Sequence, residues 1–154
     1  MKDQPFLNYG KQSIDESDIQ AVVEVLKGDW LTQGPNVTDF ERAICDYTGA
    51  KYCVAVSNGT AALHLAVLAL EIKEGSRGIT SPNTFVASAN CLVYAGLKPD
   101  FADIRADTYN IDFNQIKKRA AANTKVIVAV DFAGQAADLE QIYTKKKKKG
   151  IKVI

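Results

Sequence analysis

The chain has 154 residues, with 19 Lys and Arg against 18 Asp and Glu, and 47% of its residues are hydrophobic. This composition is typical of a folded globular domain and excludes a disordered, collagen-like or disulfide-rich chain. A chain of about 150 residues buries roughly two thirds of the surface that its unfolded state exposes, which is enough for one domain with a core.

The near-neutral charge conceals one basic run, Lys145 to Lys149. Without these five lysines, 14 basic residues stand against 18 acidic ones. The rest of the chain therefore offers no electrostatic surface for nucleic acid, and we predict no nucleic-acid partner. No segment approaches the roughly 18 apolar residues of a membrane span, and the first residues lack an apolar signal segment. We expect a cytoplasmic protein without a membrane partner.

The three cysteines, Cys45, Cys53 and Cys91, lie far apart in apolar segments. Their spacing resembles no zinc site, so we predict buried free thiols and no metal. His64 is the only histidine and stands between two leucines on a predicted helix. This position favours a packing or surface role over a catalytic one.

The first part of the chain predicts two helices, which we assign to an N-terminal helical segment, residues 1–50. Ser13 and Glu16 have the spacing of a capping box before the first helix. Apolar residues then recur at helical intervals, and Gly28 and Gly49 end the two patterns; these residues are Ile19, Val22, Val23 and Leu26, then Val37, Phe40, Ile44 and Tyr47. The intervening segment, 29–35, predicts an exposed loop that holds the only Trp.

Residues 51–154 alternate short apolar runs with helical patterns. The expected strands are 52–56, 78–81, 99–103, 125–130 and 151–154. The expected helices are 60–70, 85–94, 112–122, which Asp112 and Gln115 would cap, and one from Asp138 through the lysine run. Repeated strand and helix units predict an α/β three-layer sandwich, a mostly parallel sheet with helices on both faces. The functional groups of such sheets lie just beyond the carboxyl ends of the strands, and the last expected strand, 151–154, is the end of this sequence. We therefore expect an incomplete domain, the N-terminal piece of a longer one.

Three loops at those strand ends could carry chemistry: 57–61, 81–85 and 131–135. The first opens a helix, where free N–H groups, the helix dipole and the Thr60 hydroxyl could hold a phosphate. The alternative is an ordinary capped turn. In the second loop, the default interpretation of Phe85 is a core residue. The alternative is an aromatic surface on which a flat ring stacks. In the third, Asp131 could orient a ligand, although capping of the following turn is the default.

Four segments together resemble the DegT/StrS family of sugar aminotransferases, which use pyridoxal phosphate and have the aspartate-aminotransferase fold (fold type I). They are WLTQGP at 30–35, SNGTAALHLA at 57–66, SPNTFVASAN at 81–90 and DFAGQAADL at 131–139. Within the family, the chain is most similar to the pseudaminic-acid branch, whose members act on UDP-4-keto-6-deoxy-N-acetylhexosamines.

The resemblance implies roles for individual residues. Gly59, Thr60 and Ala61 would bind the cofactor phosphate, and Phe85 would stack on the pyridine ring. Thr32 and Gln33 would approach the nucleotide-sugar substrate, from one subunit of a homodimer into the shared site.

The family's catalytic Lys, and the Asp that holds the pyridine nitrogen protonated, would follow the strand that ends at Ile154. We therefore assign no catalytic residue and expect this chain alone to be inactive. The whole protein would move an amino group, usually from the amino donor glutamate, to the C4 ketone of the sugar.

Two alternatives remain open from the sequence. The first is another family member, either a different sugar aminotransferase or a sugar dehydratase, in which His replaces the catalytic Lys. The second is a truncated, non-catalytic module that binds a nucleotide sugar or a partner subunit.

Overall fold

A computed structural model describes residues 10–146 and 150–154 of the chain. The chain divides into two compact units, Met1–Ala55 (unit 1) and Val56–Ile154 (unit 2). Each unit is described by itself below.

Unit 1 contains two helices, α1 (Glu16–Lys27) and α2 (Pro35–Thr48). The predicted capping box of Ser13 and Glu16 is wrong, because the box is formed two residues later by Asp15 and Asp18. The Asp15 carboxylate accepts hydrogen bonds from the N–H groups of Ser17 (2.8 Å) and Asp18 (3.2 Å), and the Asp18 carboxylate accepts from the N–H of Asp15 (3.0 Å). A charged carboxylate is the stronger acceptor for these unpaired N–H groups.

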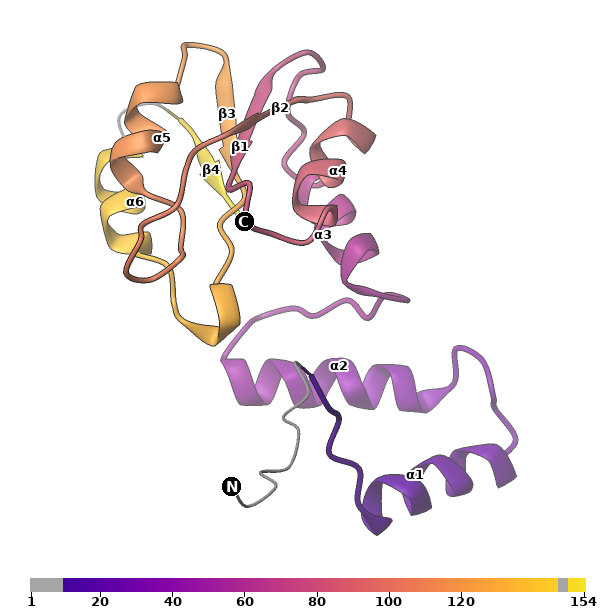
Figure 1. The fold of residues 1–154 in the computed structure, drawn as a ribbon. Coiled ribbons are helices and arrows are strands. Elements are labelled where there is room, and N and C mark those ends of the chain that lie inside the picture. The colour runs from indigo at the N-terminus through magenta and orange to yellow at the C-terminus, as the bar shows by residue number, and fades with distance from the viewer. Residues whose placement is uncertain (1–9, 147–149) are drawn as a thin grey trace, which may run out of the picture. The chain divides into compact units, whose positions relative to one another are not determined.

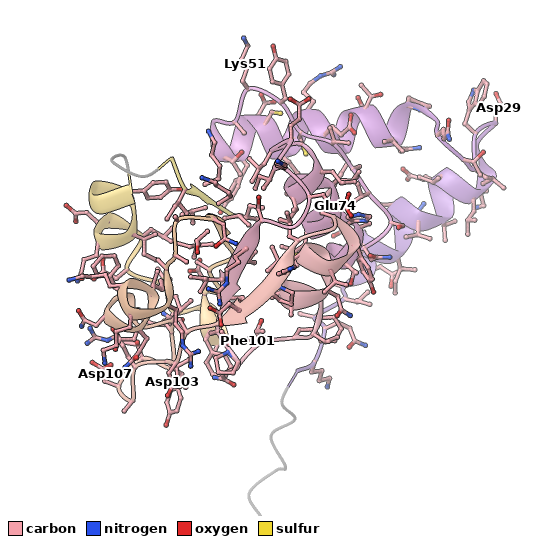
Figure 2. All side chains as sticks on the ribbon, turned by 90° about the horizontal axis from the view of Figure 1, so that it is seen from above. Asp29, Lys51, Glu74, Phe101, Asp103 and Asp107 are labelled. Carbon is pink, nitrogen blue, oxygen red and sulfur yellow. The ribbon has the colours of Figure 1, made fainter. Side chains whose placement is uncertain are left out.

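The second helix ends at Gly49 as predicted but begins at Pro35, which the sequence analysis placed in the preceding loop. Pro35 occupies its first turn, and Gly49 ends it in the left-handed conformation with φ of +73°. Neither helix of unit 1 has a buried residue. Their apolar faces are exposed within the unit, and charged side chains such as Asp29 and Lys51 project from the loops that follow the helices (Figure 2).

The predicted strand at 52–56 is wrong, because this segment forms no strand in the structure. The Tyr52 side chain is 77% exposed and that of Val54 is 73% exposed. A strand requires a partner for its backbone hydrogen bonds, and no described strand pairs with this segment. The N–H of Ala55 instead donates to the Glu41 carboxylate at 2.8 Å.

Unit 2 is built on a four-stranded sheet in the order β2-β1-β3-β4, in which every pair of neighbours is parallel. This confirms the predicted parallel sheet. Strand β1 (Arg77–Thr80) has the predicted length but begins one residue earlier, and the other three are shorter than predicted: β2 (Lys98–Phe101), β3 (Thr124–Ile127) and β4 (Lys152–Val153).

Helices cover both faces of the sheet, as the strand and helix alternation predicts. Figure 1 shows α3 and α4 on one face and α5 and α6 on the other. Their bounds are α3 (Gly59–Leu68), α4 (Ala87–Tyr94), α5 (Phe113–Arg119) and α6 (Leu139–Lys146). The Asp112 side chain caps α5, as expected, by accepting from the N–H of Asn114. The predicted continuation of α6 through the rest of the lysine run, 147–149, lies outside the described residues.

Each face of the sheet has its own hydrophobic core, because successive side chains of a strand point to opposite faces. The core under α5 and α6 includes Ile79 and Ile127, whereas the core under α3 and α4 includes Val126 and Val128. Gly78 leaves room for a side chain of α4 on the sheet: a Cβ there would be 2.5 Å from a methyl group of Leu92. The sequence thus sets the helix-to-sheet distance through one glycine.

Candidate functional site

The carboxyl ends of β1 and β3 bring two of the candidate loops to the same edge of the sheet. The two strands are neighbours, and the N–H of Val128 donates to the Ile79 carbonyl at 2.8 Å. Loops 81–85 and 131–135 therefore leave the sheet side by side. In Figure 1, the first turns of α3 and α4 lie at this same end of unit 2. Two of the three candidate loops thus lie at strand ends as predicted, whereas loop 57–61 follows no strand and leads directly into α3.

The start of α3 has the features of an anion site. Asn58 caps the helix: its side-chain oxygen accepts from the N–H of Ala61 at 2.9 Å, and its carbonyl accepts from the N–H of Ala62 at 3.1 Å. Within the described residues, the N–H groups of Gly59 and Thr60 have no partner, as expected for a first helical turn. Apart from its chain neighbours and the backbone of α3 itself, no heavy atom of the described residues lies within 4 Å of the position that a Cβ on Gly59 would occupy. The helix start is therefore open to a ligand and positively polarised.

The Phe85 side chain is 75% exposed, so the default interpretation of a core residue is wrong. The helix that we predicted to start at Phe85 begins two residues later, at Ala87, so Phe85 belongs to the loop. Hydroxyl groups fix this loop: Ser81 donates to the carbonyl of Asn83 at 3.2 Å, and the Thr84 hydroxyl lies 2.7 Å from that of Ser88. The loop thus presents an aromatic ring to its surroundings instead of to the core.

Thr80 is a residue at this edge that the sequence analysis missed. It ends β1, is wholly buried, and its hydroxyl has no hydrogen-bond partner among the described residues. An unsatisfied buried hydroxyl costs about 1–3 kcal/mol, so it is uncommon. No local pattern in the sequence distinguishes this threonine from an ordinary strand residue.

The default interpretation of Asp131 as the cap of the following turn is wrong, because the turn at Phe132–Gly134 has no side-chain cap hydrogen bond; the carboxylate instead holds the far end of the loop. It accepts a hydrogen bond from the N–H of Ala137 at 2.8 Å. The intervening turn contains Ala133, a non-glycine residue with φ of +52°, followed by Gly134 with φ of +81°. This strained turn is held from outside by Asn110, a second residue that the sequence analysis missed because its partners are 22 to 26 positions away.

The two predicted substrate residues, Thr32 and Gln33, belong to unit 1. Both are exposed in the loop between α1 and α2, where Gln33 has φ of +53°. The loop requires glycine at position 34, because the Cβ of any other residue there would lie 2.5 Å from the Cβ of Trp30. The loop is therefore a tight turn that holds its polar side chains in solvent.

The remaining candidates have structural roles. The ring of His64 packs edge-on against Tyr94, with 5.5 Å between the ring centroids. All three cysteines are free, but only Cys91 is buried as predicted, whereas Cys45 and Cys53 are partly exposed. Burial raises the pKa of the Cys91 thiol, which makes it a poor nucleophile. Among residues 10–146 and 150–154, no group of His, Cys, Asp or Glu is placed to hold a metal ion. In the same part of the chain, no helix is both long enough and apolar enough to cross a membrane.

Comparison with known proteins assigns the chain to a family. Residues 12–154 match the DegT/DnrJ/EryC1/StrS aminotransferase family, and the chain belongs to it. It is 41% identical over 151 residues to the UDP-4-amino-4,6-dideoxy-N-acetyl-beta-L-altrosamine transaminase of Campylobacter jejuni, covering 96% of this chain and 40% of that protein.

Solved structures agree with the family and the fold. Helicobacter pylori PseC, an aminotransferase of pseudaminic-acid biosynthesis, matches with a TM-score of 0.89 at 34% identity, over 95% of this chain and 40% of that one. A Streptococcus pneumoniae protein described as a sugar aminotransferase, in its PMP form, matches with a TM-score of 0.86 at 30% identity, over 95% of this chain and 37% of that one. A GDP-4-keto-6-deoxymannose-3-dehydratase matches with a TM-score of 0.87 at 27% identity, over 96% and 40%.

These matches confirm the predicted family and the fold-type-I architecture. The cofactor of the family is pyridoxal phosphate, and the Streptococcus pneumoniae protein has been solved in both PLP and PMP forms. The chain spans about two fifths of the length of the proteins it matches. It is thus similar to one part of an aminotransferase.

Proposed function

We propose that this chain supplies the phosphate-binding and ring-stacking part of a nucleotide-sugar aminotransferase. The observation that carries the proposal is the open start of α3, where two unpaired N–H groups lie at the same end of unit 2 as the first turn of α4, which the exposed Phe85 precedes by two residues. A phosphate and an aromatic ring are the two ends of pyridoxal phosphate. The residues present therefore fit the cofactor of the family.

In this proposal the N–H groups of Gly59 and Thr60 and the Thr60 hydroxyl bind the phosphate, and Phe85 stacks on the ring. The backbone of Ala61 takes part by closing the first helical turn, since its N–H is engaged by Asn58. Bound pyridoxal phosphate supplies an electron sink for amino transfer. The chain's own residues bind and orient it, and Thr32 and Gln33 contact the nucleotide sugar.

We assign the substrates by analogy with the Campylobacter jejuni transaminase, whose name specifies a 4-amino-4,6-dideoxy sugar on UDP. The acceptor is then a UDP-4-keto-6-deoxy-N-acetylhexosamine, aminated at C4, and the donor is glutamate. We further propose a cytoplasmic homodimer. Residues 1–50 would form its N-terminal helical segment and residues 51–154 the first part of its cofactor-binding domain, with catalysis requiring sequence beyond this chain.

The proposal is tested with the complete protein encoded by the reading frame that contains this chain. It is incubated with pyridoxal phosphate, glutamate labelled with ¹⁵N at the amino group, and the UDP-4-keto-6-deoxy sugar, and the products are analysed by mass spectrometry. We expect a ¹⁵N-labelled amino sugar. Loss of a hydroxyl group from a keto sugar without nitrogen transfer would identify a dehydratase instead.

The 154-residue chain is assayed in parallel under the same conditions. We expect it to transfer no nitrogen, because it contains none of the residues that we assign to the chemical step. Transfer by this chain alone would show that a lysine within it serves as the catalytic residue. A complete protein that binds the nucleotide sugar without converting it would support the non-catalytic module.

A further inference from the structure

The side chain of Asn110 holds a loop that is distant in sequence. It is only 3% exposed. Its amide oxygen accepts a hydrogen bond from the N–H of Phe132 at 2.9 Å, and its amide nitrogen donates to the carbonyls of Gln135 (2.8 Å) and Ala136 (3.1 Å). One side chain therefore satisfies three backbone groups of the loop that follows β3.

The loop that Asn110 holds is strained. Ala133 adopts φ of +52°, a left-handed conformation that disfavours any residue with a Cβ. On the other side of the contact, Tyr109 has φ of +58° and its ring packs on Phe132 with 6.0 Å between centroids. The strained Tyr109 thus packs on Phe132, the chain neighbour of the strained Ala133, and Asn110 bonds the N–H of the same Phe132. Such conformations persist only where surrounding interactions fix them.

Asn110 is itself fixed by its own loop. Its carbonyl accepts from the N–H of Arg105 at 2.9 Å, and the bridge between Ile104 and Ile111 closes the loop around it. The Arg105 guanidinium binds the Asp107 carboxylate through two nitrogens. The hydrogen bonds from Asn110 therefore start from a defined position.

The loop is fixed through its backbone, but the residues at its tip are exposed. Ala133, Gly134, Gln135 and Ala136 are exposed, although the loop that carries them is hydrogen-bonded at both ends. The tip lies at the carboxyl end of β3, the strand next to β1, whose own loop carries Phe85. A rigid, strained and exposed turn at this edge is suited to contact a ligand.

We infer that Asn110 is a positioning residue of the cofactor site, which it shapes by holding the 131–137 loop against the bound ring of pyridoxal phosphate. This inference rests on the proposed function. It adds a residue that contacts no ligand and acts only through the backbone of the loop.

The test compares Asn110→Ala with Asn114→Ala, a control that removes an exposed asparagine on the neighbouring helix α5. In the 154-residue chain, hydrogen exchange is measured at the N–H groups of Phe132 and Ala137. In the complete protein, the dissociation constant of pyridoxal phosphate is measured by titration. We expect faster exchange and about tenfold weaker binding for Asn110→Ala only, the change that loss of one or two ordinary hydrogen bonds would produce.

Two further variants separate positioning from general stability. Asn110→Asp keeps the acceptor for the N–H of Phe132 but, when ionised, cannot donate to the carbonyls of Gln135 and Ala136, so it should also weaken cofactor binding. This variant provides the test if Asn110→Ala does not fold. Ala133→Gly removes the strain of the turn. Added to Asn110→Ala, it should recover part of the lost affinity, whereas in the wild-type background it should change affinity little.

The outcomes are distinguishable. If wild-type protein binds pyridoxal phosphate and both Asn110 variants bind it equally well while the loop exchanges faster, Asn110 is only structural and the inference is wrong. The inference would also be wrong if Ala133→Gly raised the affinity for pyridoxal phosphate equally in the wild-type and Asn110→Ala backgrounds. If the wild-type complete protein does not bind pyridoxal phosphate, the proposed function itself fails.

Discussion

The exposure of Phe85 makes a quantitative prediction for Phe85→Ala. The side chain is 75% exposed, so about a quarter of its surface is buried. For a phenylalanine of roughly 200 Å² this is about 50 Å², which at about 25 cal/mol per Å² corresponds to roughly 1 kcal/mol. A core phenylalanine would lose about 3–5 kcal/mol on the same change. The free energy of unfolding of the 154-residue chain, measured by urea denaturation, separates the two values.

Leu92→Ala is the matched control, because Leu92 is fully buried between α4 and the sheet. It should lose about 2–5 kcal/mol. In the complete protein, Phe85→Ala should weaken pyridoxal phosphate binding by about two- to tenfold, the equivalent of one aromatic contact worth about 0.5–1.5 kcal/mol. A loss of stability equal to that of Leu92→Ala, with unchanged cofactor binding, would refute the assignment of Phe85 as a stacking platform.

Three further predictions test other parts of the structure. Gly78→Ala should lower the free energy of unfolding, measured by urea denaturation, by about 1–3 kcal/mol, because its Cβ would lie 2.5 Å from a Leu92 methyl group. In a Leu92→Ala background the loss should be smaller, and an equal loss in both backgrounds would contradict the packing. The pKa of Asp15 is lowered mainly by the Ser17 hydroxyl and then by the N–H groups of Asp18 and Ser17, so its stabilisation of α1 is present above about pH 4 and is lost as the pH falls through the lowered value. Asp15→Asn should therefore reduce helical circular dichroism at pH 7 relative to wild type and differ less at pH 3, and a constant difference would count against the cap. Burial raises the pKa of Cys91, so Cys91 should react with a disulfide reagent at pH 8 much more slowly than the partly exposed Cys53, as mass spectrometry of the labelled chain would show; equal rates would be inconsistent with the buried thiol.

Features encoded by neighbouring residues were predictable from the sequence. The glycine that ends α2, the Asp112 cap of α5 and the parallel order of strand and helix units all depend on local patterns. The gathering of loops 81–85 and 131–135 at one edge follows from that topology, since parallel strands end on the same side, whereas loop 57–61 follows no strand. The exposure of Phe85 was not predictable from the residues alone, because an aromatic residue near a helix start is usually buried.

Features that depend on distant partners were missed. Residues 52–56 have the composition of a strand, but a strand is defined by a neighbour, and none of the described strands pairs with them. Asn110 reads as an ordinary loop residue until its hydrogen bonds to Phe132, Gln135 and Ala136 are seen. The unpaired hydroxyl of Thr80 likewise depends on what surrounds the end of β1.

The central claim is that the start of α3 binds the cofactor phosphate, and one comparison of affinities tests it most directly. In the complete protein, the dissociation constants of pyridoxal phosphate and of pyridoxal, which lacks the phosphate, are measured for wild type, Thr60→Ser, Thr60→Val and Phe85→Leu. The account predicts that Thr60→Val reduces the preference for the phosphorylated form, that Thr60→Ser retains it, and that Phe85→Leu weakens both ligands equally. An unchanged preference in Thr60→Val, with the protein folded and binding pyridoxal phosphate as wild type does, would contradict the proposed phosphate site.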